Sequence, residues 1–135
     1  MPALLIDSNV LLDVMTEDAR WFAWSAASIE RAADSFRLVI NPIIYAEVSV
    51  RFSKIEELEM ALPKAILERE AIPYEAAFLA GKCFVSYRRR GGLKRSPLPD
   101  FFIGAHAAVA GYRLMTRNAA RYRAYFPKLA LIAPE

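Results

Sequence analysis

The chain has 135 residues, 56% of them hydrophobic and 24% charged, which fits one globular domain with a sizeable core and excludes a disordered protein. Its net charge of +3 permits a nucleic-acid partner without requiring one. The single cysteine, Cys83, excludes an internal disulfide and suits a reducing cytoplasm, which is the location we expect. The chain starts directly with an apolar strand, so we expect no signal peptide, and no apolar run is long enough to span a membrane.

Short apolar runs alternate with longer amphipathic runs and predict strands and helices in turn. The strands are expected at residues 3–7, 36–40, 113–116 and 129–132. The helices are expected at residues 8–15, 19–34, 42–52, 55–62, 74–90, 101–111 and 118–125. Residues 65–72 are ambiguous between a helical turn and a short edge strand. Strands that alternate with helices favour a mostly parallel sheet covered on both faces, so residues 1–135 are predicted to form a single α/β domain.

Polar residues that could carry chemistry follow the predicted strands. Asp7 ends the first strand, and Thr116 and Asn118 follow the third. Asp100 comes after a proline at the start of an apolar helix, and Glu47 lies within an otherwise apolar helix. Because open α/β sheets bind ligands at the carboxyl ends of their strands, three carboxylates and an amide are expected to converge there.

Three carboxylates packed together repel one another and raise each other's pKa, and a hard divalent cation relieves that repulsion. Mg²⁺ and Mn²⁺ prefer oxygen ligands and keep several waters when a few carboxylates bind them. Such a cation can activate water and hold the oxygens of a phosphodiester. No other chemistry competes, because the chain has one histidine, no Cys/His cluster and no phosphate-binding glycine loop.

Each candidate also has a simpler structural interpretation. Asp7 could be a polar strand terminus, Asp100 a helix N-cap, and Glu47 a solvated position on an amphipathic helix. Asn118 is interpreted by composition as a helix cap. Several other residues are expected to be structural, namely Asp13 as a surface charge or helix-end contact, His106 as a satisfied core histidine, Cys83 as a buried small residue, and Tyr122, Tyr125 and Phe126 as packing.

A basic, flexible loop is predicted at residues 88–99, where two glycines break the preceding helix. It is either a solvated loop or a phosphate-binding rim. The candidate RNA contacts are Arg88, Arg89, Arg90, Lys94, Arg95 and, further along, Arg117.

Four segments in a fixed order carry a resemblance to a known family. They read IDSNVLLD from residue 6, PIIYAEV from residue 42, LPDFFIGAHA from residue 98 and LMTRNAARYRAYFP from residue 114. Together they resemble PIN-domain proteins, and more narrowly the VapC-type toxins of bacterial toxin–antitoxin pairs, over essentially the whole chain. The resemblance implies a three-layer α/β/α sandwich around a twisted, mostly parallel sheet of four or five strands.

The resemblance also implies a function. It points to a Mg²⁺-dependent endoribonuclease, with Mn²⁺ as a possible substitute, that acts on single-stranded or looped RNA such as tRNA, rRNA or mRNA. It further implies a cognate VapB-like antitoxin that wraps the toxin and blocks its site, and a toxin homodimer.

Residue by residue, the family's metal-binding acids match Asp7, Glu47 and Asp100, and its late hydroxyl residue matches Thr116. Ser8 stands where threonine is common, which keeps the hydroxyl. Asn118 is the one departure, because it replaces a fourth acid by an amide that can accept a hydrogen bond but brings no charge. Three carboxylates suffice for one Mg²⁺ and weaken the case for a second tightly held ion.

The leading hypothesis is a metal-dependent endoribonuclease whose three carboxylates ligate the ion directly or through water, while Thr116 and Asn118 orient water or a carboxylate. The alternative is a PIN-like module that binds RNA or protein with weak or no catalysis, and Asn118 is the residue that favours it. A phosphatase with Asp7 as nucleophile ranks last, because the second aspartate that such enzymes usually carry two residues later is Asn9 here.

Overall fold

The computed structural model describes residues 1–135 and contains one five-stranded sheet in which all neighbouring strands are parallel. The strands are β1 (Ala3–Ile6), β2 (Arg37–Ile40), β3 (Leu67–Arg69), β4 (Arg113–Met115) and β5 (Leu131–Ile132). Their order across the sheet is β3-β2-β1-β4-β5. The predicted α/β fold is therefore confirmed, and β3 shows that the ambiguous segment at 65–72 contains a short edge strand.

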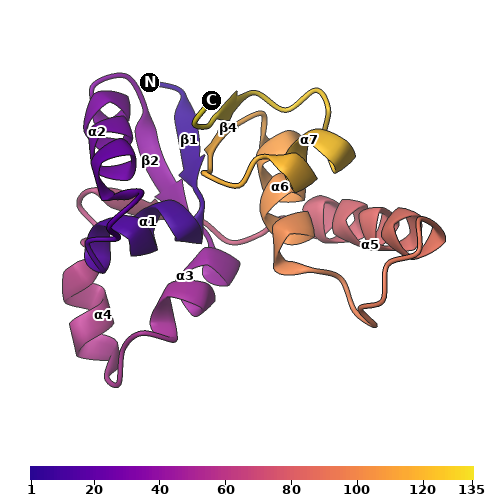
Figure 1. Ribbon diagram of the computed structural model, residues 1–135, viewed down its shortest axis with the longest axis horizontal. Coiled ribbons are helices and arrows are strands. Elements are labelled where there is room, and N and C mark those ends of the chain that lie inside the picture. Colours follow the sequence, from indigo (N-terminus) through magenta and orange to yellow (C-terminus); the bar gives the residue numbers. More distant parts are fainter.

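The helices form two layers, one on each face of the sheet (Figure 1). They are α1 (Ser8–Met15), α2 (Phe22–Ala33), α3 (Pro42–Ser49), α4 (Ile55–Ala61), α5 (Tyr74–Arg89), α6 (Pro99–Ala110) and α7 (Ala120–Tyr125). The connections from β1 through β2 to β3 cross the sheet in one direction, and those from β3 through β4 to β5 cross it in the other. Because such crossovers are right-handed, α1–α4 cover one face and α5–α7 the other.

Strand β1 lies at the centre of the sheet, and the direction in which strands are added reverses around it. Its residues are buried, as expected for a parallel strand covered on both faces. Leu5 pairs with Val39 of β2 on one side and with Leu114 of β4 on the other. Ligand sites of parallel sheets form at the carboxyl end where the strand order reverses, which here is the edge where β1 and β4 end.

Several element boundaries differ from their predicted places. Helix α2 begins three residues late, because the Asp18 Oδ1 accepts hydrogen bonds from the N–H groups of Arg20 (2.9 Å) and Trp21 (2.8 Å) and holds them in a turn. Helix α6 begins one residue before Asp100, so this residue lies in its first turn. The same helix ends at Gly111, whose φ of 73° is the left-handed conformation that glycine adopts most readily.

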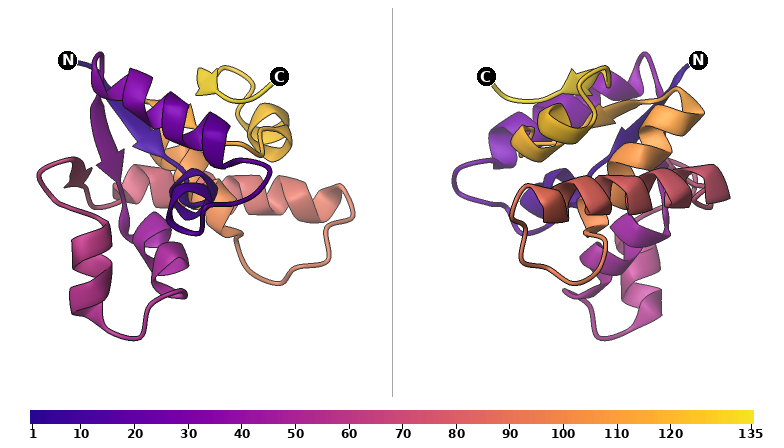
Figure 2. Two further views of the ribbon diagram at one scale, coloured as in Figure 1. Left: turned by 60° about the vertical axis from the view of Figure 1, so that its left-hand side comes forward. Right: turned by 90° about the vertical axis from the view of Figure 1, so that its right-hand side faces the viewer.

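Helices α5 and α6 pack against each other, and the loop between them extends on the side of α5 that faces away from α7 (Figure 2, right). Aromatic rings fasten the end of α5 to this layer. The ring of Phe101 meets Tyr87 edge-on at 5.8 Å between centroids, and it meets Tyr125 at 4.9 Å. The end of α5 is therefore held near α7, and the guanidinium of Arg90 lies over the ring of Tyr125. None of the helices has the length and apolar character that crossing a lipid bilayer would require.

Candidate functional site

Asp7 lies at the carboxyl end of β1, and its carboxylate is enclosed by hydrogen-bond donors from three segments. Asp7 as a whole is only 3% exposed. Its Oδ1 caps α1 by accepting from the N–H of Ser8 at 2.8 Å. Its Oδ2 accepts from the hydroxyls of Thr116 and Tyr122, both at 2.9 Å. Asp7 is therefore a buried carboxyl group whose two oxygens are both held by hydrogen bonds, which a merely polar strand terminus would not require.

Asp100 faces Asp7 across the hydroxyl of Tyr122. That hydroxyl lies 3.3 Å from the Asp100 Oδ1 and 2.9 Å from the Asp7 Oδ2, so one phenol group touches both carboxylates. The other oxygen of Asp100 lies 3.6 Å from the guanidinium of Arg121. The first turn of α6 and the start of α7 thus bring a second carboxylate to the end of β1.

Glu47 supplies the third carboxylate from α3. Its Oε1 accepts a hydrogen bond from the Ser8 hydroxyl at 2.9 Å, directly beside the Asp7 backbone. The side chain is half-buried and does not occupy the freely solvated position that the simpler interpretation assumed. Ser8 consequently links two of the predicted acids, through its N–H to Asp7 and through its hydroxyl to Glu47.

Burial raises the pKa of all three acids, and repulsion from neighbouring carboxylates adds to the rise for Asp7 and Glu47. For Asp7, burial raises the pKa most, the bonds from Thr116 and Tyr122 offset part of the rise, and the charge of Asp100 adds to it. For Glu47 the main cause is again burial, with smaller contributions from the charges of Asp7 and Asp100. The pKa of Asp100 is raised by burial and partly lowered by Arg121. A cluster of acids with raised pKa values is typical of a functional site.

Tyr122 stays protonated in this setting. Its side chain is 1% exposed, and burial together with the adjacent negative charges moves its pKa far above the ordinary value. It is therefore a permanent donor with one proton for two carboxylates. The sequence interpretation of Tyr122 as packing alone is wrong, because an aromatic residue in an apolar run gives no signal of where its hydroxyl lies.

The turn between β4 and α7 is ordered by Asn9, a residue that sequence reasoning did not assign to the site. The Asn9 amide nitrogen lies 3.4 Å from the Asp7 Oδ2 and 3.3 Å from the Thr116 hydroxyl. Its carbonyl oxygen accepts from the N–H of Arg117 at 3.2 Å. Asn9 thus ties α1 to the turn that carries Thr116 and Asn118.

Asn118 is exposed and lies at the entrance of the site near Asp100. Its N–H donates to the Thr116 hydroxyl at 3.2 Å. The expected role as a helix cap is wrong, because α7 begins two residues later and Ala119 occupies the cap position. The amide side chain is therefore available to a ligand of the site.

Asp13 is not a surface charge, because it is 2% exposed. Its Oδ2 lies 2.8 Å from the Nε of Arg117 and accepts from the Ser25 hydroxyl at 2.8 Å. The sequence placed Arg117 among the RNA contacts, but the structure shows its Nε engaged in this buried pair. Arg117 thus anchors the turn that carries Thr116 to the α1 and α2 layer.

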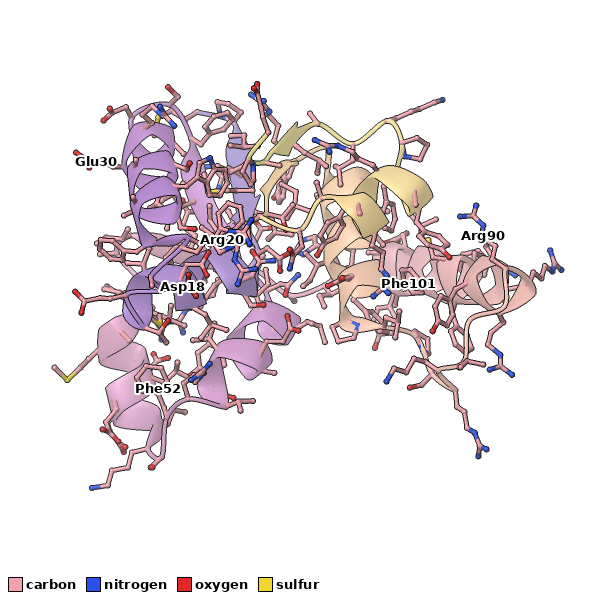
Figure 3. The ribbon with its side chains drawn as sticks, viewed as in Figure 1. Asp18, Arg20, Glu30, Phe52, Arg90 and Phe101 are labelled. Carbon is pink, nitrogen blue, oxygen red and sulfur yellow. The ribbon has the colours of Figure 1, made fainter.

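The basic loop residues differ in what they contact. The Nη1 of Arg88 donates to the carbonyl oxygens of Gly92 (3.2 Å) and Lys94 (3.1 Å), so Arg88 organises the loop itself. Arg90 lies at the end of α5 (Figure 3). Its guanidinium lies over the ring of Tyr125. The remaining members, Arg89, Lys94 and Arg95, are exposed.

An open cleft of about 770 Å³ adjoins Asp100. It is lined by Tyr87, Asp100, Arg117, Asn118, Ala119, Ala120, Arg121 and Tyr125. Asp100 therefore opens onto a surface that combines aromatic rings with arginine side chains. Arg121 was not predicted to belong to the site, because its spacing from Asp100 in the sequence gives no indication of their contact.

His106 is buried, as predicted, but only one of its ring nitrogens has a close partner. The Asn41 amide nitrogen lies 3.1 Å from the His106 Nδ1, and the Asn41 Oδ1 caps α3 by accepting from Ile44 at 3.0 Å. Since the cap fixes the amide orientation, the Nδ1 accepts and the Nε2 carries the proton. Glu70 lies 3.8 Å from that Nε2, and burial lowers the pKa of His106. The ring is a neutral core group and not a metal ligand.

The three acids match a hard divalent cation in their chemistry, since all offer oxygen donors with raised pKa values. No three acidic, histidine or cysteine side chains are placed to hold one ion directly. The arrangement fits a cation held by two carboxylates that completes its shell with water, which is the coordination Mg²⁺ favours. The hydroxyl of Tyr122 marks the point on which Asp7 and Asp100 converge.

Comparisons with known proteins agree with this architecture. The family model described as PIN domain matches residues 4–127. No curated protein sequence matches the chain significantly. The chain also shares its fold with solved structures, including the three below, at sequence identities too low to show more than the fold.

VapBC2 from Rickettsia felis bound to a DNA fragment from its promoter has a TM-score of 0.73 at 18% identity, covering 98% of this chain and 99% of that chain. VapBC-1 from nontypeable Haemophilus influenzae has the same score and identity over 97% of both chains. A toxin–antitoxin complex from Klebsiella pneumoniae has a TM-score of 0.67 at 22% identity over 98% of both chains. With a family model spanning nearly its whole length and the fold of these relatives, the chain belongs to the PIN-domain family.

Proposed function

We propose that this protein is a metal-dependent endoribonuclease, the toxin of a type II toxin–antitoxin pair. PIN domains are generally nucleases, and the chain belongs to that family. The observation that carries the proposal is the pair formed by Asp7 and Asp100, two carboxylates with raised pKa values that contact one hydroxyl at the carboxyl edge of the sheet. A divalent cation would relieve the repulsion in this pair, and Asp100 opens onto an arginine-bearing cleft that suits a polyanion.

In this proposal Asp7 and Asp100 hold Mg²⁺ or Mn²⁺, and Glu47 reaches the ion through water. When bound, the cation lowers the pKa of water and stabilises negative charge on the phosphodiester. Its binding also offsets the repulsion that contributes to the raised pKa of Asp7 and Glu47.

The surrounding side chains fix the acids in place. Thr116 and Tyr122 each donate to Asp7 and hold its carboxylate in one orientation. Ser8 does the same for Glu47. Arg121 lies beside Asp100 at the mouth of the cleft, where it is positioned to meet a phosphate of the incoming strand. Asn118 at the same entrance orients water through its amide.

The partners follow from the same assignment. The similar structures from R. felis and H. influenzae are VapBC complexes, which supports a VapB-like antitoxin as the partner of this chain. We expect the substrate to be tRNA, rRNA or mRNA, the toxin to be a homodimer, and the protein to act in the cytoplasm.

Cleavage of a tRNA pool by the purified protein tests the proposal. The reactions contain Mg²⁺, Mn²⁺ or EDTA and compare the wild type with Asp7→Asn and with Asp34→Asn, an exposed acid outside the site. We expect cutting that needs the metal, disappears in Asp7→Asn and persists in Asp34→Asn. Full activity of Asp7→Asn, or cutting in EDTA, would contradict the assignment.

A second candidate is a PIN-like module that binds RNA or protein without cutting it. The observation in its favour is Asn118, an uncharged residue at the entrance of the site. This candidate predicts RNA binding that is the same with Mg²⁺ and with EDTA, and no cleavage under either condition.

A further inference from the structure

The cleft beside Asp100 has one part that the metal chemistry does not use. Besides its charged and amide side chains, the lining contains two aromatic residues, Tyr87 and Tyr125, and two small ones, Ala119 and Ala120. Small side chains leave room in a cleft, and aromatic side chains offer flat faces. The lining therefore suits a planar molecule larger than a phosphate or a hydrated ion.

Tyr125 presents such a face to the cleft. Its ring is held by Phe101, which it meets at 4.9 Å and an interplanar angle of 62°. The guanidinium of Arg90 lies over the Tyr125 ring at 4.6 Å from the centroid. Arg90 is exposed and forms no ion pair, so a competing group can displace it or insert beneath it. A planar cation over this ring shows that the face accepts flat, polarisable groups.

The loop that carries Arg90 is fixed relative to the cleft. Gly92 packs against the ring of Tyr87 so closely that any side chain at this position would overlap the ring. The N–H of Lys94 donates to the Tyr87 hydroxyl at 3.3 Å. Tyr87 is thereby held from both the loop and α6, and Arg90 stays near Tyr125.

We propose that this part of the cleft is a nucleobase subsite, in which an unpaired RNA base stacks on Tyr125 beneath Arg90. The inference rests on the proposed function, since it places this base next to the phosphate held at Asp100. Aromatic faces combined with arginines are the usual platform for unpaired bases, and a paired base in a duplex cannot offer its face. The subsite thus assigns to Tyr125 the recognition of an unpaired nucleotide beside the cleavage point.

Fluorescence anisotropy with a fluorescein-labelled twelve-nucleotide oligoadenylate in EDTA tests this subsite independently of cleavage. We expect Tyr125→Leu to raise the Kd about tenfold, within the range found for loss of one stacked base. Tyr125→Trp keeps an aromatic face and should bind within about twofold of the wild type. The matched control is Tyr74→Leu, a tyrosine that is 92% exposed at the opposite end of α5, and it should bind like the wild type.

A second probe keeps the test valid even if Tyr125→Leu disturbs folding. An abasic oligomer of the same length should bind the wild type about tenfold more weakly than oligoadenylate, and Tyr125→Leu should lose this preference. Equal Kd values of the wild type for both oligomers would overturn the subsite. If the wild type cuts RNA but Tyr125→Leu binds oligoadenylate normally, the subsite is wrong and the nuclease assignment stands. If the wild type neither binds nor cuts RNA, both are wrong.

Discussion

The hydroxyl of Tyr122 donates to the Asp7 carboxylate at 2.9 Å in the interior of the protein. Asp7 is 3% exposed and Tyr122 1%, so neither group has water as a substitute partner. The same hydroxyl lies 3.3 Å from Asp100. Tyr122 thus reduces the cost of placing two carboxylates together, a role that a divalent cation would share when it binds.

Replacing Tyr122 by Phe should therefore destabilise the metal-free protein and increase its response to metal. Loss of a buried hydrogen bond to a charged group should lower the free energy of unfolding in EDTA by about 1.5 kcal/mol. Mn²⁺ should restore more stability to Tyr122→Phe than to the wild type, because it replaces the missing donor. Urea unfolding with EDTA and with Mn²⁺ measures both effects. Equal gains from Mn²⁺ in the two proteins would show that Tyr122 and the metal act on different groups.

The raised pKa of Glu47 predicts a pH dependence of stability. A carboxyl group whose pKa is higher in the folded state binds more protons there, so its contribution is present at low pH and is lost as the pH rises through the folded pKa. Glu47→Gln removes this titration. The difference in the free energy of unfolding between Glu47→Gln and the wild type should therefore grow in favour of the variant from about pH 4 to pH 7 in EDTA.

Urea unfolding at intervals across this range measures that difference. The comparison between variant and wild type cancels other titrations, including that of His106, whose lowered pKa acts in the opposite direction. A constant difference across the range would show that the environment of Glu47 does not raise its pKa. With Mg²⁺ present we expect the difference to shrink, because the cation stabilises the ionised wild type.

The parts of the fold and site that the sequence predicted are those with local signals. Asp7 directly follows an apolar run, and Asp100 follows a proline at the start of an apolar helix, so each could be placed at an element boundary. The contacts of Tyr122, Arg121 and Asn9 could not be predicted, since they join residues about 20 to 115 positions apart. The burial of Asp13 was missed for the same reason, because its partner Arg117 lies 104 positions later in the sequence.

The ion pair of Asp13 and Arg117 lies apart from the proposed metal ligands, and breaking it should lower the stability of the protein. Asp13→Asn keeps the shape of the side chain but removes the charge opposite Arg117, and it should lower the free energy of unfolding by about 2 kcal/mol. The cost stays below that of a fully buried pair because the Arg117 side chain is 24% exposed and can reach water. Urea unfolding measures the loss, and Asp34→Asn, at an exposed position, should leave stability within about 0.5 kcal/mol of the wild type. A loss of about 0.5 kcal/mol or less in Asp13→Asn would mean that the ion pair makes no net contribution to the free energy of unfolding.

Asn118→Asp tests whether the uncharged residue at the entrance limits the enzyme. A fourth carboxylate near Asp100 should tighten Mn²⁺ binding, because each added anion strengthens the attraction of the site for a divalent cation. We expect the Mn²⁺ concentration for half-maximal cleavage to fall several-fold, with stability unchanged because Asn118 is exposed. Asn118→Ser is the matched control, since it removes the amide without adding charge.

Titration of cleavage against Mn²⁺ separates the outcomes. A lower Mn²⁺ requirement in Asn118→Asp alone would establish that residue 118 faces the ion and that its charge sets metal affinity. An unchanged requirement in both variants would place Asn118 outside the reach of the metal. If the wild type is inactive and Asn118→Asp gains metal-dependent cleavage, the native protein is the binding module, and its amide is the reason that it does not cut.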